Sequence, residues 1–471
     1  MNALRNAILR LIDRRRSIAT IGALLVAIGT TIVMSACTTR TPIRHIVIVV
    51  QENRSFNSLF MGFPGANTAT TGACKPLSRL GLCTHGGRIA LHPITLETCR
   101  CFGGRDIQHN HAGFEIEYDD GKMDGFDLIG LGTTGRKGPA GPYPYAYVVK
   151  RETQPYWNLA RRYALADEMF STATTNSFVA HQQLIAATTR LNPSESLTDV
   201  PNGYPWGCDA PPGTRTAIIT VSGLLRNDGP FPCITQYRTM ADVLDAARVG
   251  WTYYVDDFRD NGGDLSGGNW NAFDAIEHVR YDKDWRAHIF MPNTTIFRDI
   301  DRGKLPAVAW VIPSLLDSDH PLSGSNSGPS WVAAVVNAIG RSSYWKDTAI
   351  IVVWDDWGGF YDNVAPAQLD YTSLGMRVPM ILISPWAKRG FVSHTHYEFG
   401  SILKFVEETF STASLGATDT RAASIDDLFD YTQTPRPFIS VPASYPSAYF
   451  LGRRVFPKPS ALVRAVSVDG D

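Results

Sequence analysis

The sequence carries little net charge, with 44 Lys and Arg side chains against 45 Asp and Glu, for a formal charge of −1. It also has no internal repeat and no low-complexity tract. These absences exclude a collagenous, coiled-coil or disordered chain. Binding nucleic acid without regard to sequence needs a basic face, which a chain of this balance is not expected to have. We therefore expect no nucleic-acid partner.

Cysteine is scarce, with seven residues, and no two of them form a C-x-x-C pair. Six remain when Cys37 is set aside, and an even number is typical of disulfides in an oxidising compartment. The six are Cys74, Cys83, Cys99, Cys101, Cys208 and Cys233. The last two stand far from the others, so we expect them to pair with each other and the first four to pair among themselves. Clustered thiols also bind zinc, which is the alternative for those four.

The first 37 residues have the pattern of an export signal. Five arginines precede an uncharged stretch, residues 17–36, which ends in Met34-Ser35-Ala36-Cys37. The ending resembles a bacterial lipobox, in which Cys37 is lipidated, and Arg15-Arg16-Ser17-Ile18 resembles the twin-arginine export pattern. An uncleaved anchor is the alternative, because at ~1.5 Å per residue the stretch is long enough to cross a bilayer. We expect an exported protein, either periplasmic, a cell-surface lipoprotein or secreted.

The remaining residues, 38–471, are predicted to form one α/β domain with its core at about 43–440. Continuous apolar runs rich in β-branched residues predict strands buried on both faces, as in a mostly parallel sheet flanked by helices. The predicted strands cover 43–50, 307–312, 349–354 and 378–384, and helical patterns cover Trp331–Ile339 and Ser401–Phe410. Two segments rich in Gly, Pro and Cys, 66–104 and 192–232, are predicted to be disulfide-bound loop insertions.

Polar side chains follow two of the predicted strands directly. Glu52 and Asn53 come after the first strand, and Asp355 and Asp356 come after the run that ends at Trp354. Ligands of open α/β sheets bind beyond the carboxyl ends of the strands, where three carboxylates and an amide would hold a divalent cation or position a phosphoryl group. The alternative is that these acids only end strands in surface turns.

The two motifs resemble those of a known family. Glu52-Asn53-Arg54-Ser55-Phe56 and Asp355-Asp356-x-Gly-Gly-Phe-Tyr-Asp362 are similar to motifs of the bacterial phosphoesterase family that contains phosphatidylcholine-type phospholipases C and secreted acid phosphatases. Further matching motifs follow in order over roughly 43–440. They are Asp106-x-x-His109, Gly121-Lys122-Met123-Asp124-Gly125-Phe126, His320-Pro321, His394-Thr395-x-Tyr397 and Asp427-Leu428-Phe429-Asp430. The resemblance implies an alkaline-phosphatase-like fold.

The resemblance also implies the residues of the site. The family holds a metal ion with the residues that match Glu52, Asn53, Asp355 and Asp356, and we expect a divalent cofactor of unknown identity. The family's hydroxyl nucleophile matches Ser177, with Ser171 and Thr175 as local alternatives. A serine at such a metal attacks phosphorus and forms a phosphoserine, which water then hydrolyses.

The family's histidines match His109 and His320, and more weakly His278. With an ordinary pKa near ~6.5, His109 or His320 is suited to protonate the leaving oxygen. Three departures from the family pattern are Asn57, Val179-Ala180 and Asn363. The family has a histidine where Asn363 stands, and an amide cannot transfer protons at neutral pH.

These features predict an exported phosphoesterase that hydrolyses phosphate esters through a metal-assisted serine. The substrate is a phospholipid or a small phosphate ester, and contact with a membrane surface would come from the lipid anchor or from the substrate. Trp354 and Trp357, which bracket the aspartates, either pack in the core or form a wall for a choline-like cation. The alternative function is a non-catalytic cell-surface binding protein that has kept the fold.

Overall fold

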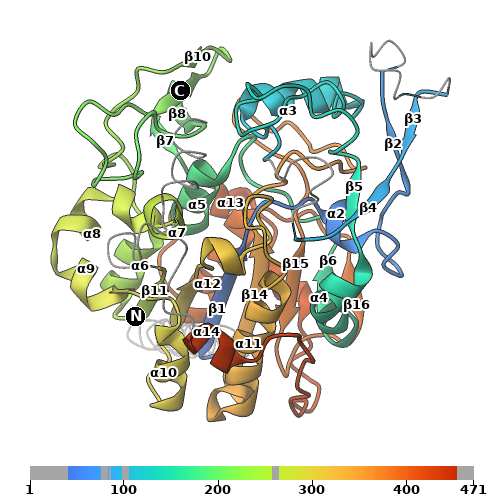
Figure 1. Cartoon of the computed structure of the whole chain (residues 1–471). Coiled ribbons are helices and arrows are strands. Elements are labelled where there is room, and N and C mark those ends of the chain that lie inside the picture. The colour runs from blue at the N-terminus through green and yellow to red at the C-terminus, as the bar shows by residue number, and fades with distance from the viewer. Residues whose placement is uncertain (1–40, 76–82, 84–85, 98–105, 257–264, 453–471) are drawn as a thin grey trace, which may run out of the picture. The chain divides into compact units, whose positions relative to one another are not determined.

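The central sheet of the computed structural model has eight strands in the order β12-β11-β13-β1-β14-β15-β6-β16 (Figure 1). They are β1 (His45–Gln51), β6 (Ala164–Ala166), β11 (Trp251–Tyr254), β12 (Ile289–Phe290), β13 (Val308–Val311), β14 (Thr348–Trp354), β15 (Met380–Ile383) and β16 (Phe391–Ser393). The structure describes residues 41–75, 83, 86–97, 106–256 and 265–452. All neighbours are parallel except the two pairs that β15 makes with β14 and β6.

The four predicted strands are confirmed as β1, β13, β14 and β15, and the fold is the expected mostly parallel α/β sheet. The interior of β1 and of β14 is a continuous apolar run because both strands are covered on both faces, and every residue of β14 is buried. β15 is antiparallel because no crossover helix lies in the 355–379 connection. The chain therefore turns back at the edge where β14 ends instead of returning to the opposite edge.

Helices pack around this sheet, and both predicted helices are confirmed, as α11 and α12. The larger ones are α3 (His111–Tyr118), α4 (Lys150–Arg162), α5 (Ser177–Ala186), α6 (Met240–Ala247), α10 (Thr295–Asp301), α11 (Gly328–Arg341) and α12 (Phe399–Phe410). The short ones are α2 (Phe56–Phe60), α7 (Leu265–Asn269), α8 (Glu277–Tyr281), α9 (Lys283–His288), α13 (Thr418–Arg421) and α14 (Ser447–Gly452). Within the described ranges, no helix is both long and apolar enough to cross a bilayer.

The segment 192–232 is more ordered than the loop insertion predicted for it. It contributes to a four-stranded antiparallel sheet in the order β10-β9-β8-β7. These strands are β7 (Arg190–Asn192), β8 (Glu195–Thr198), β9 (Ala217–Thr220) and β10 (Leu225–Arg226). They are too short to stand out among the Gly and Pro of the segment. The predicted Cys208–Cys233 disulfide is present and closes the segment between β8 and α6.

The first cysteine group forms a disulfide between Cys74 and Cys83, which removes two of the thiolates that the zinc interpretation requires. Cys99 and Cys101 lie outside the described residues. Near Cys74 the chain forms a β2 (Thr71–Ala73) and β3 (Arg88–Ala90) hairpin and a pair of β4 (His92–Ile94) with β5 (Ala146–Val148).

The described residues from Ile43 on form one compact unit. The predicted export signal, with Cys37, lies outside the described residues, and the domain boundary after Cys37 stays a prediction.

Candidate active site

Two parallel neighbouring strands bring the predicted metal ligands together. Gln51 at the end of β1 pairs with Trp354 at the end of β14, so the residues that follow each strand leave the sheet side by side. The backbone N–H of Asn53 donates to Oδ1 of Asp355 at 2.9 Å. The two strand ends are thus joined directly at the carboxyl edge of the sheet.

The backbone around these residues is closely packed. Asn53 has a φ of 50°, in the left-handed region, and Gly358 has a φ of 62°. A Cβ atom at Gly358 would lie 2.5 Å from the carbonyl oxygen of Asn53. Only glycine allows the turn after Asp356 to approach the turn after β1 this closely.

Ser177 joins this group from the first turn of α5. The Asn53 Nδ2 group donates to Ser177 Oγ at 3.3 Å, and Ser177 Oγ donates to Asp356 Oδ2 at 3.2 Å and to Glu52 Oε2 at 3.5 Å. The expected proximity of the serine and the four ligand candidates is therefore confirmed, while their roles stay a prediction.

The two other hydroxyl candidates are engaged elsewhere. Ser171 Oγ donates to the carbonyl of Ala173 at 3.3 Å, and Thr175 Oγ1 donates to Asp199 at 2.6 Å. Among the described residues, neither hydroxyl forms a hydrogen bond to the carboxylates of Glu52, Asp355 or Asp356.

The three carboxylates are fully buried, and the pKa values of Glu52 and Asp356 show the cost of that arrangement. Burial, followed by repulsion from Asp355 and Asp356, holds the pKa of Glu52 well above its ordinary value. Burial and repulsion from Asp355 likewise raise the pKa of Asp356. Among the described residues, Oδ2 of Asp355 and Oδ1 of Asn53 are buried without a hydrogen-bond partner. Three acidic side chains and two unpartnered oxygens in one buried place fit a divalent cation.

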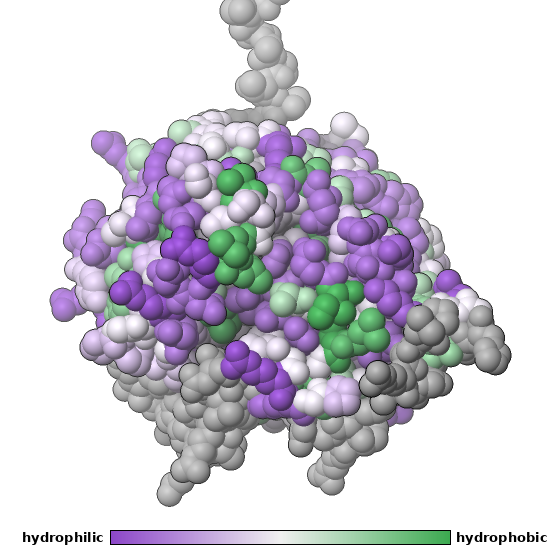
Figure 2. Space-filling model, turned by 90° about the horizontal axis from the view of Figure 1, so that it is seen from above, coloured by the Kyte–Doolittle hydropathy of each residue, from purple (hydrophilic) through white to green (hydrophobic). Residues whose placement is uncertain are grey.

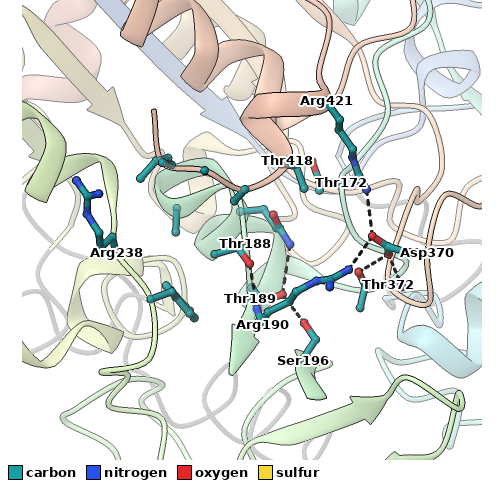
Figure 3. A pocket seen from close by; sticks show the side chains of 16 residues that line it. Thr172, Thr188, Thr189, Arg190, Ser196, Arg238, Asp370, Thr372, Thr418 and Arg421 are labelled. Carbon is teal, nitrogen blue, oxygen red and sulfur yellow. Dashed lines mark hydrogen bonds and ion pairs between the residues drawn. The ribbon is translucent and has the colours of Figure 1, made fainter. Parts of the chain in front are cut away.

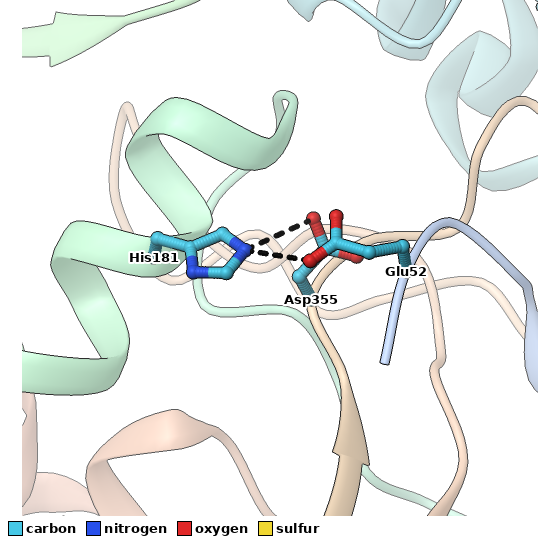
Figure 4. Close-up of side chains that lie close together, drawn as sticks. All are labelled: Glu52, His181 and Asp355. Atoms are coloured by element: carbon cyan, nitrogen blue, oxygen red, sulfur yellow. Dashed lines mark hydrogen bonds and ion pairs between the residues drawn. The ribbon is translucent and has the colours of Figure 1, made fainter. Parts of the chain in front are cut away.

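His181 lies in the same place, although the sequence had not singled it out as a ligand (Figure 4). Its Nε2 atom is 2.8 Å from Glu52 Oε1 and 4.0 Å from Asp355 Oδ2. One ligand atom from each of the three residues lies within 4.8 Å of the others, a spacing that suits a shared metal ion. Burial lowers the pKa of His181 to about 4, so the ring is neutral, as a metal-ligating imidazole must be.

His109 is held in one tautomer beside the site. Its Nδ1 group donates to the carbonyl of Ile107 at 2.6 Å, which leaves Nε2 as the acceptor, 3.2 Å from Nδ2 of Asn53. Trp357 packs edge-on against the His109 ring with centroids 6.2 Å apart. The ring therefore offers a lone pair toward the serine and its neighbours.

His320 has the opposite tautomer. The N–H of Leu322 donates to His320 Nδ1 at 3.1 Å, so the neutral ring carries its proton on Nε2. Burial lowers the pKa of His320 to about 4, opposed by the negative charge of Asp106 and reinforced by His109. The ordinary pKa expected from the sequence is therefore wrong for His320, because the ring is removed from water. At neutral pH it acts as a hydrogen-bond donor.

Comparison with known proteins decides the family. A model of the Phosphoesterase family matches residues 43–413. The chain belongs to this family. The chain is a phosphoesterase, a hydrolase acting on phosphate esters, as the resemblance implied, and the non-catalytic alternative is not favoured.

Curated relatives of this phosphoesterase include several phospholipases C. Phospholipase C A of Mycobacterium tuberculosis is 24% identical over 450 residues, covering 85% of this chain and 80% of that protein. The hemolytic phospholipase C of Pseudomonas aeruginosa is 26% identical over 456 residues, covering 85% of this chain and 58% of that protein. Among solved structures, a protein in the alkaline phosphatase superfamily from Vibrio parahaemolyticus is similar, with a TM-score of 0.34, 14% identity, and coverage of 58% of this chain and 65% of that one.

The remaining candidate histidine does not join the phosphoesterase site. His278 lies on α8 with about half of its side chain exposed, and its Nε2 atom pairs with Asp242 at 2.9 Å. No contact between His278 and the carboxylate group is found in the described part of the chain. The weak motif match is thus explained by a surface ion pair next to α6.

Two departures from the family pattern have structural partners away from Ser177. The side-chain amide of Asn57 donates to the carbonyl of Ala69, and its oxygen accepts from the backbone N–H of Ala69. An ionised aspartate cannot fill both roles, because it has no donor. Asn363 donates to Asn67 at 2.9 Å and accepts from Arg377 at 3.1 Å. Neither amide contributes to the hydrogen bonds around the serine that the structure describes.

The two tryptophans that bracket the aspartates are buried in the core. Trp354 donates to Asp319 at 3.0 Å, and Trp357 donates to Glu117 at 2.7 Å. Both side chains are fully buried, which favours the core-packing interpretation over an exposed wall for a choline-like cation.

A separate polar pocket of about 430 Å³ lies near the other end of α5 (Figure 3). Arg190 and Arg421 both pair with Asp370 there at 3.0 Å. Gln183, six residues after Ser177, also lines it. At 100° per residue those two side chains leave the helix in different directions, so the pocket and the serine occupy different faces of α5.

Proposed function

We propose that this phosphoesterase is an exported enzyme that hydrolyses phosphate esters, of phospholipase C or acid phosphatase type, with Ser177 as its nucleophile. The observation that carries the proposal is the hydrogen bond between Ser177 Oγ and Asp356 Oδ2, made inside a buried group of three carboxylates. A serine in a surface or purely structural role has no need of such surroundings, whose burial is costly without a cation.

Glu52, Asn53, Asp355 and Asp356 would hold a divalent metal ion, with His181 as a further ligand from α5. When bound, the ion would withdraw charge from the phosphoryl oxygens and lower the pKa of the serine hydroxyl. The buried, unpartnered oxygens of Asn53 and Asp355 support this ligand set, because each has a lone pair without a donor among the described residues.

The chain's own groups then account for the proton transfers. Ser177 Oγ forms a bond to phosphorus as the bond from phosphorus to the leaving oxygen breaks, and the serine proton passes to Asp356. In its imidazolium form, with a second proton on the Nε2 atom that is the acceptor in the neutral ring, His109 would donate to the leaving oxygen. The neutral His109 then accepts a proton from the water that attacks the phosphoserine. Asp356 returns its proton to Ser177 Oγ as the bond from that oxygen to phosphorus breaks, so the ring, the carboxylate and the serine regain their starting states.

Asn176 and the start of α5 suit the binding of the phosphoryl group. The side-chain amide of Asn176 is buried next to Ser177, and neither of its polar atoms has a hydrogen-bond partner in the described part of the chain. The first N–H groups of a helix attract anions, so the first turn of α5 would orient the non-bridging oxygens toward the serine.

We propose the substrate class from the two curated relatives described above, both of which are named as phospholipases C. We infer a phospholipid or a small phosphate ester as substrate. Export is proposed from residues 1–37, which end in a cysteine suited to lipid attachment, so that the enzyme acts in the periplasm, on the cell surface or outside the cell.

The test is a substrate panel measured with the purified chain, with and without a chelator. The substrates are p-nitrophenyl phosphate, p-nitrophenylphosphorylcholine and phosphatidylcholine. We expect hydrolysis of at least one, its loss with the chelator, and no turnover by Ser177→Ala. Chelator-resistant hydrolysis of the panel would overturn the metal assignment, and absence of all hydrolysis by a metal-loaded chain would overturn the proposed function.

A further inference from the structure

The four-stranded sheet β10-β9-β8-β7 carries an exposed apolar tip that the proposed chemistry does not use. Between β9 and β10 the chain reads Val221-Ser222-Gly223-Leu224, and Leu225 opens β10. Val221 is 62% exposed, Leu224 59% and Leu225 40%. Three large apolar side chains exposed within five residues are uncommon on a soluble surface and indicate an interaction site.

The tip is held in a fixed position. The N–H of Gly223 donates to the carbonyl of Thr220 at 2.8 Å, and the N–H of Val221 donates to the carbonyl of Ser194 at 2.9 Å. The Cys208–Cys233 disulfide fastens the segment at its base. A Cβ atom at Gly223, with a φ of 78°, would meet nothing within 4 Å, so the turn is open to solvent. The apolar side chains are therefore presented outward on an ordered support.

The support is attached to the segment that leads into the active site. Asp199, directly after β8, accepts hydrogen bonds from Thr175 Oγ1 at 2.6 Å and from the N–H of His111 at 2.7 Å. Thr175 lies two residues before Ser177, and His111 opens α3 two residues after His109. β10 and α3 both lie at the top in Figure 1, the side of the molecule opposite α10 and α11.

The same side exposes a further apolar side chain. Ile116, on α3, is 38% exposed. Figure 2, which looks down on this face, shows apolar patches set among polar side chains. The tip and α3 thus lie on a side of the molecule that exposes apolar patches among polar side chains.

Charge decides which surface fits the tip. No charged residue lies between Val221 and Leu225, and the adjacent Arg226 is paired with Asp228 at 2.8 Å and with Glu195 at 3.1 Å. A neutral apolar tip does not suit an anionic membrane, which attracts unpaired basic side chains. It suits the interface of a zwitterionic bilayer, where apolar side chains enter the headgroup region without a charge partner.

We propose that the hairpin tip Val221–Leu225 docks on a zwitterionic phospholipid surface and holds the site against it. The proposal rests on the proposed function, in that a phospholipid is one of its two substrate classes. Docking of this kind affects substrates held in a bilayer and leaves soluble esters unaffected.

The test compares Val221→Ser/Leu224→Ser with the control Ile439→Ser. Ile439 is 58% exposed. Its backbone carbonyl accepts a hydrogen bond from Arg162, which precedes the start of β6 and so lies at the edge of the central sheet opposite the carboxyl ends of β1 and β14. Sedimentation with phosphatidylcholine vesicles measures binding, and hydrolysis of vesicle lipid and of p-nitrophenylphosphorylcholine measures turnover. We expect the tip variant to bind vesicles roughly tenfold more weakly and to hydrolyse vesicle lipid with a raised apparent KM, because less apolar surface enters the bilayer. Soluble turnover and the control should match the wild type.

If the tip variant bound vesicles as well as the wild type, the proposal would be overturned. The same holds if binding of the wild type required anionic lipid, or if the tip mediated self-association of the chain instead. A chain that binds vesicles through the tip but hydrolyses no ester would refute the proposed function and leave docking intact. Should the double variant fail to fold, Ser222→Cys labelled with an environment-sensitive fluorophore gives a second measurement. Its emission should shift to the blue on vesicle addition, and an unchanged emission would count against docking.

Discussion

The Nε2 atom of His181 lies 2.8 Å from Oε1 of Glu52, although 129 residues separate the two in the chain. The contact joins α5 to the end of β1, so the helix that carries Ser177 is fixed to the candidate metal ligands at a second point. The position of α5 and the proposed metal site would thus be coupled through one imidazole.

Replacing His181 by alanine should weaken metal binding by tenfold or more, because one ligand nitrogen is lost and Glu52 is left without its partner. Competition between the protein and a metal-indicator dye measures this without relying on activity. His278→Ala is the control, since that ring pairs with Asp242 at the surface and should leave affinity unchanged. Equal affinities for both variants would show that His181 only orients the carboxylate.

Ser177→Ala and Asp355→Asn should fail in different ways. The serine variant should lose turnover by ~10³-fold or more with metal still bound, because only the attacking oxygen is removed. Asp355→Asn keeps the shape of the side chain and removes one charge, so excess metal should restore part of its turnover. Steady-state rates over a metal titration separate the two. Normal turnover in Ser177→Ala, together with a loss in Thr175→Ala, would reassign the nucleophile.

Glu407 on α12 should make stability depend on pH. Burial, opposed by the N–H of Leu415 and reinforced by Asp419, raises the pKa of Glu407 to about 7. The folded state therefore binds a proton that the unfolded state has released above its ordinary pKa near 4.5. The stabilisation is complete below that value and is lost as the pH rises through about 7.

Glu407→Gln stays neutral and can still accept from Leu415, so it should unfold a few degrees higher than wild type at pH 8.5 and at nearly the same temperature at pH 5. Thermal unfolding at the two pH values measures the difference. Glu408→Gln, one residue along the chain, is the matched control. If Glu407→Gln unfolded at the wild-type temperature at pH 8.5, the raised pKa of the Glu407 carboxyl in the folded protein would be refuted.

Removing Cys208–Cys233 should destabilise the chain by about 3 kcal/mol, on the view that a cross-link restricts the unfolded chain. The Cys208–Cys233 bridge spans 25 residues, whereas Cys74–Cys83 spans nine. The variant in which Cys74 and Cys83 are both replaced by serine should therefore lose less stability. Denaturant unfolding of the two double serine variants gives the order. A reversed order would show that native packing, and not chain entropy, sets the loss.

The sheet could be predicted because its central strands are continuous apolar runs, which only a doubly covered strand favours. The convergence of Glu52 with Asp355 followed from the same reasoning, since parallel neighbours end at one edge. The resemblance to a family added Ser177. The antiparallel direction of β15 could not be predicted, because it depends on a connection without a helix. The strands β7–β10 could not be predicted because they are too short to show a periodic pattern.

The place of His181 could not be predicted with confidence because it depends on the orientation of α5 against the sheet. The spacing of four residues from Ser177 predicts only that both side chains lie on one face of the helix. Similarly, the low pKa of His320 comes from burial by surrounding segments, which no local pattern around His320-Pro321 records.

The pairing of β1 with β14 has a consequence for the order of events during synthesis. His45 pairs with Thr348, so the inner pair of the sheet joins segments made far apart in time. A ribosome-bound chain that ends before Thr348 contains Ser177 and Glu52 but lacks β14, the strand that brings Asp355 and Asp356 beside them. Under the proposed mechanism, truncated or still-growing chains would therefore be inert toward the phosphate esters of the cell that makes them, and catalytic competence would begin only after the second half of the polypeptide has folded onto the first.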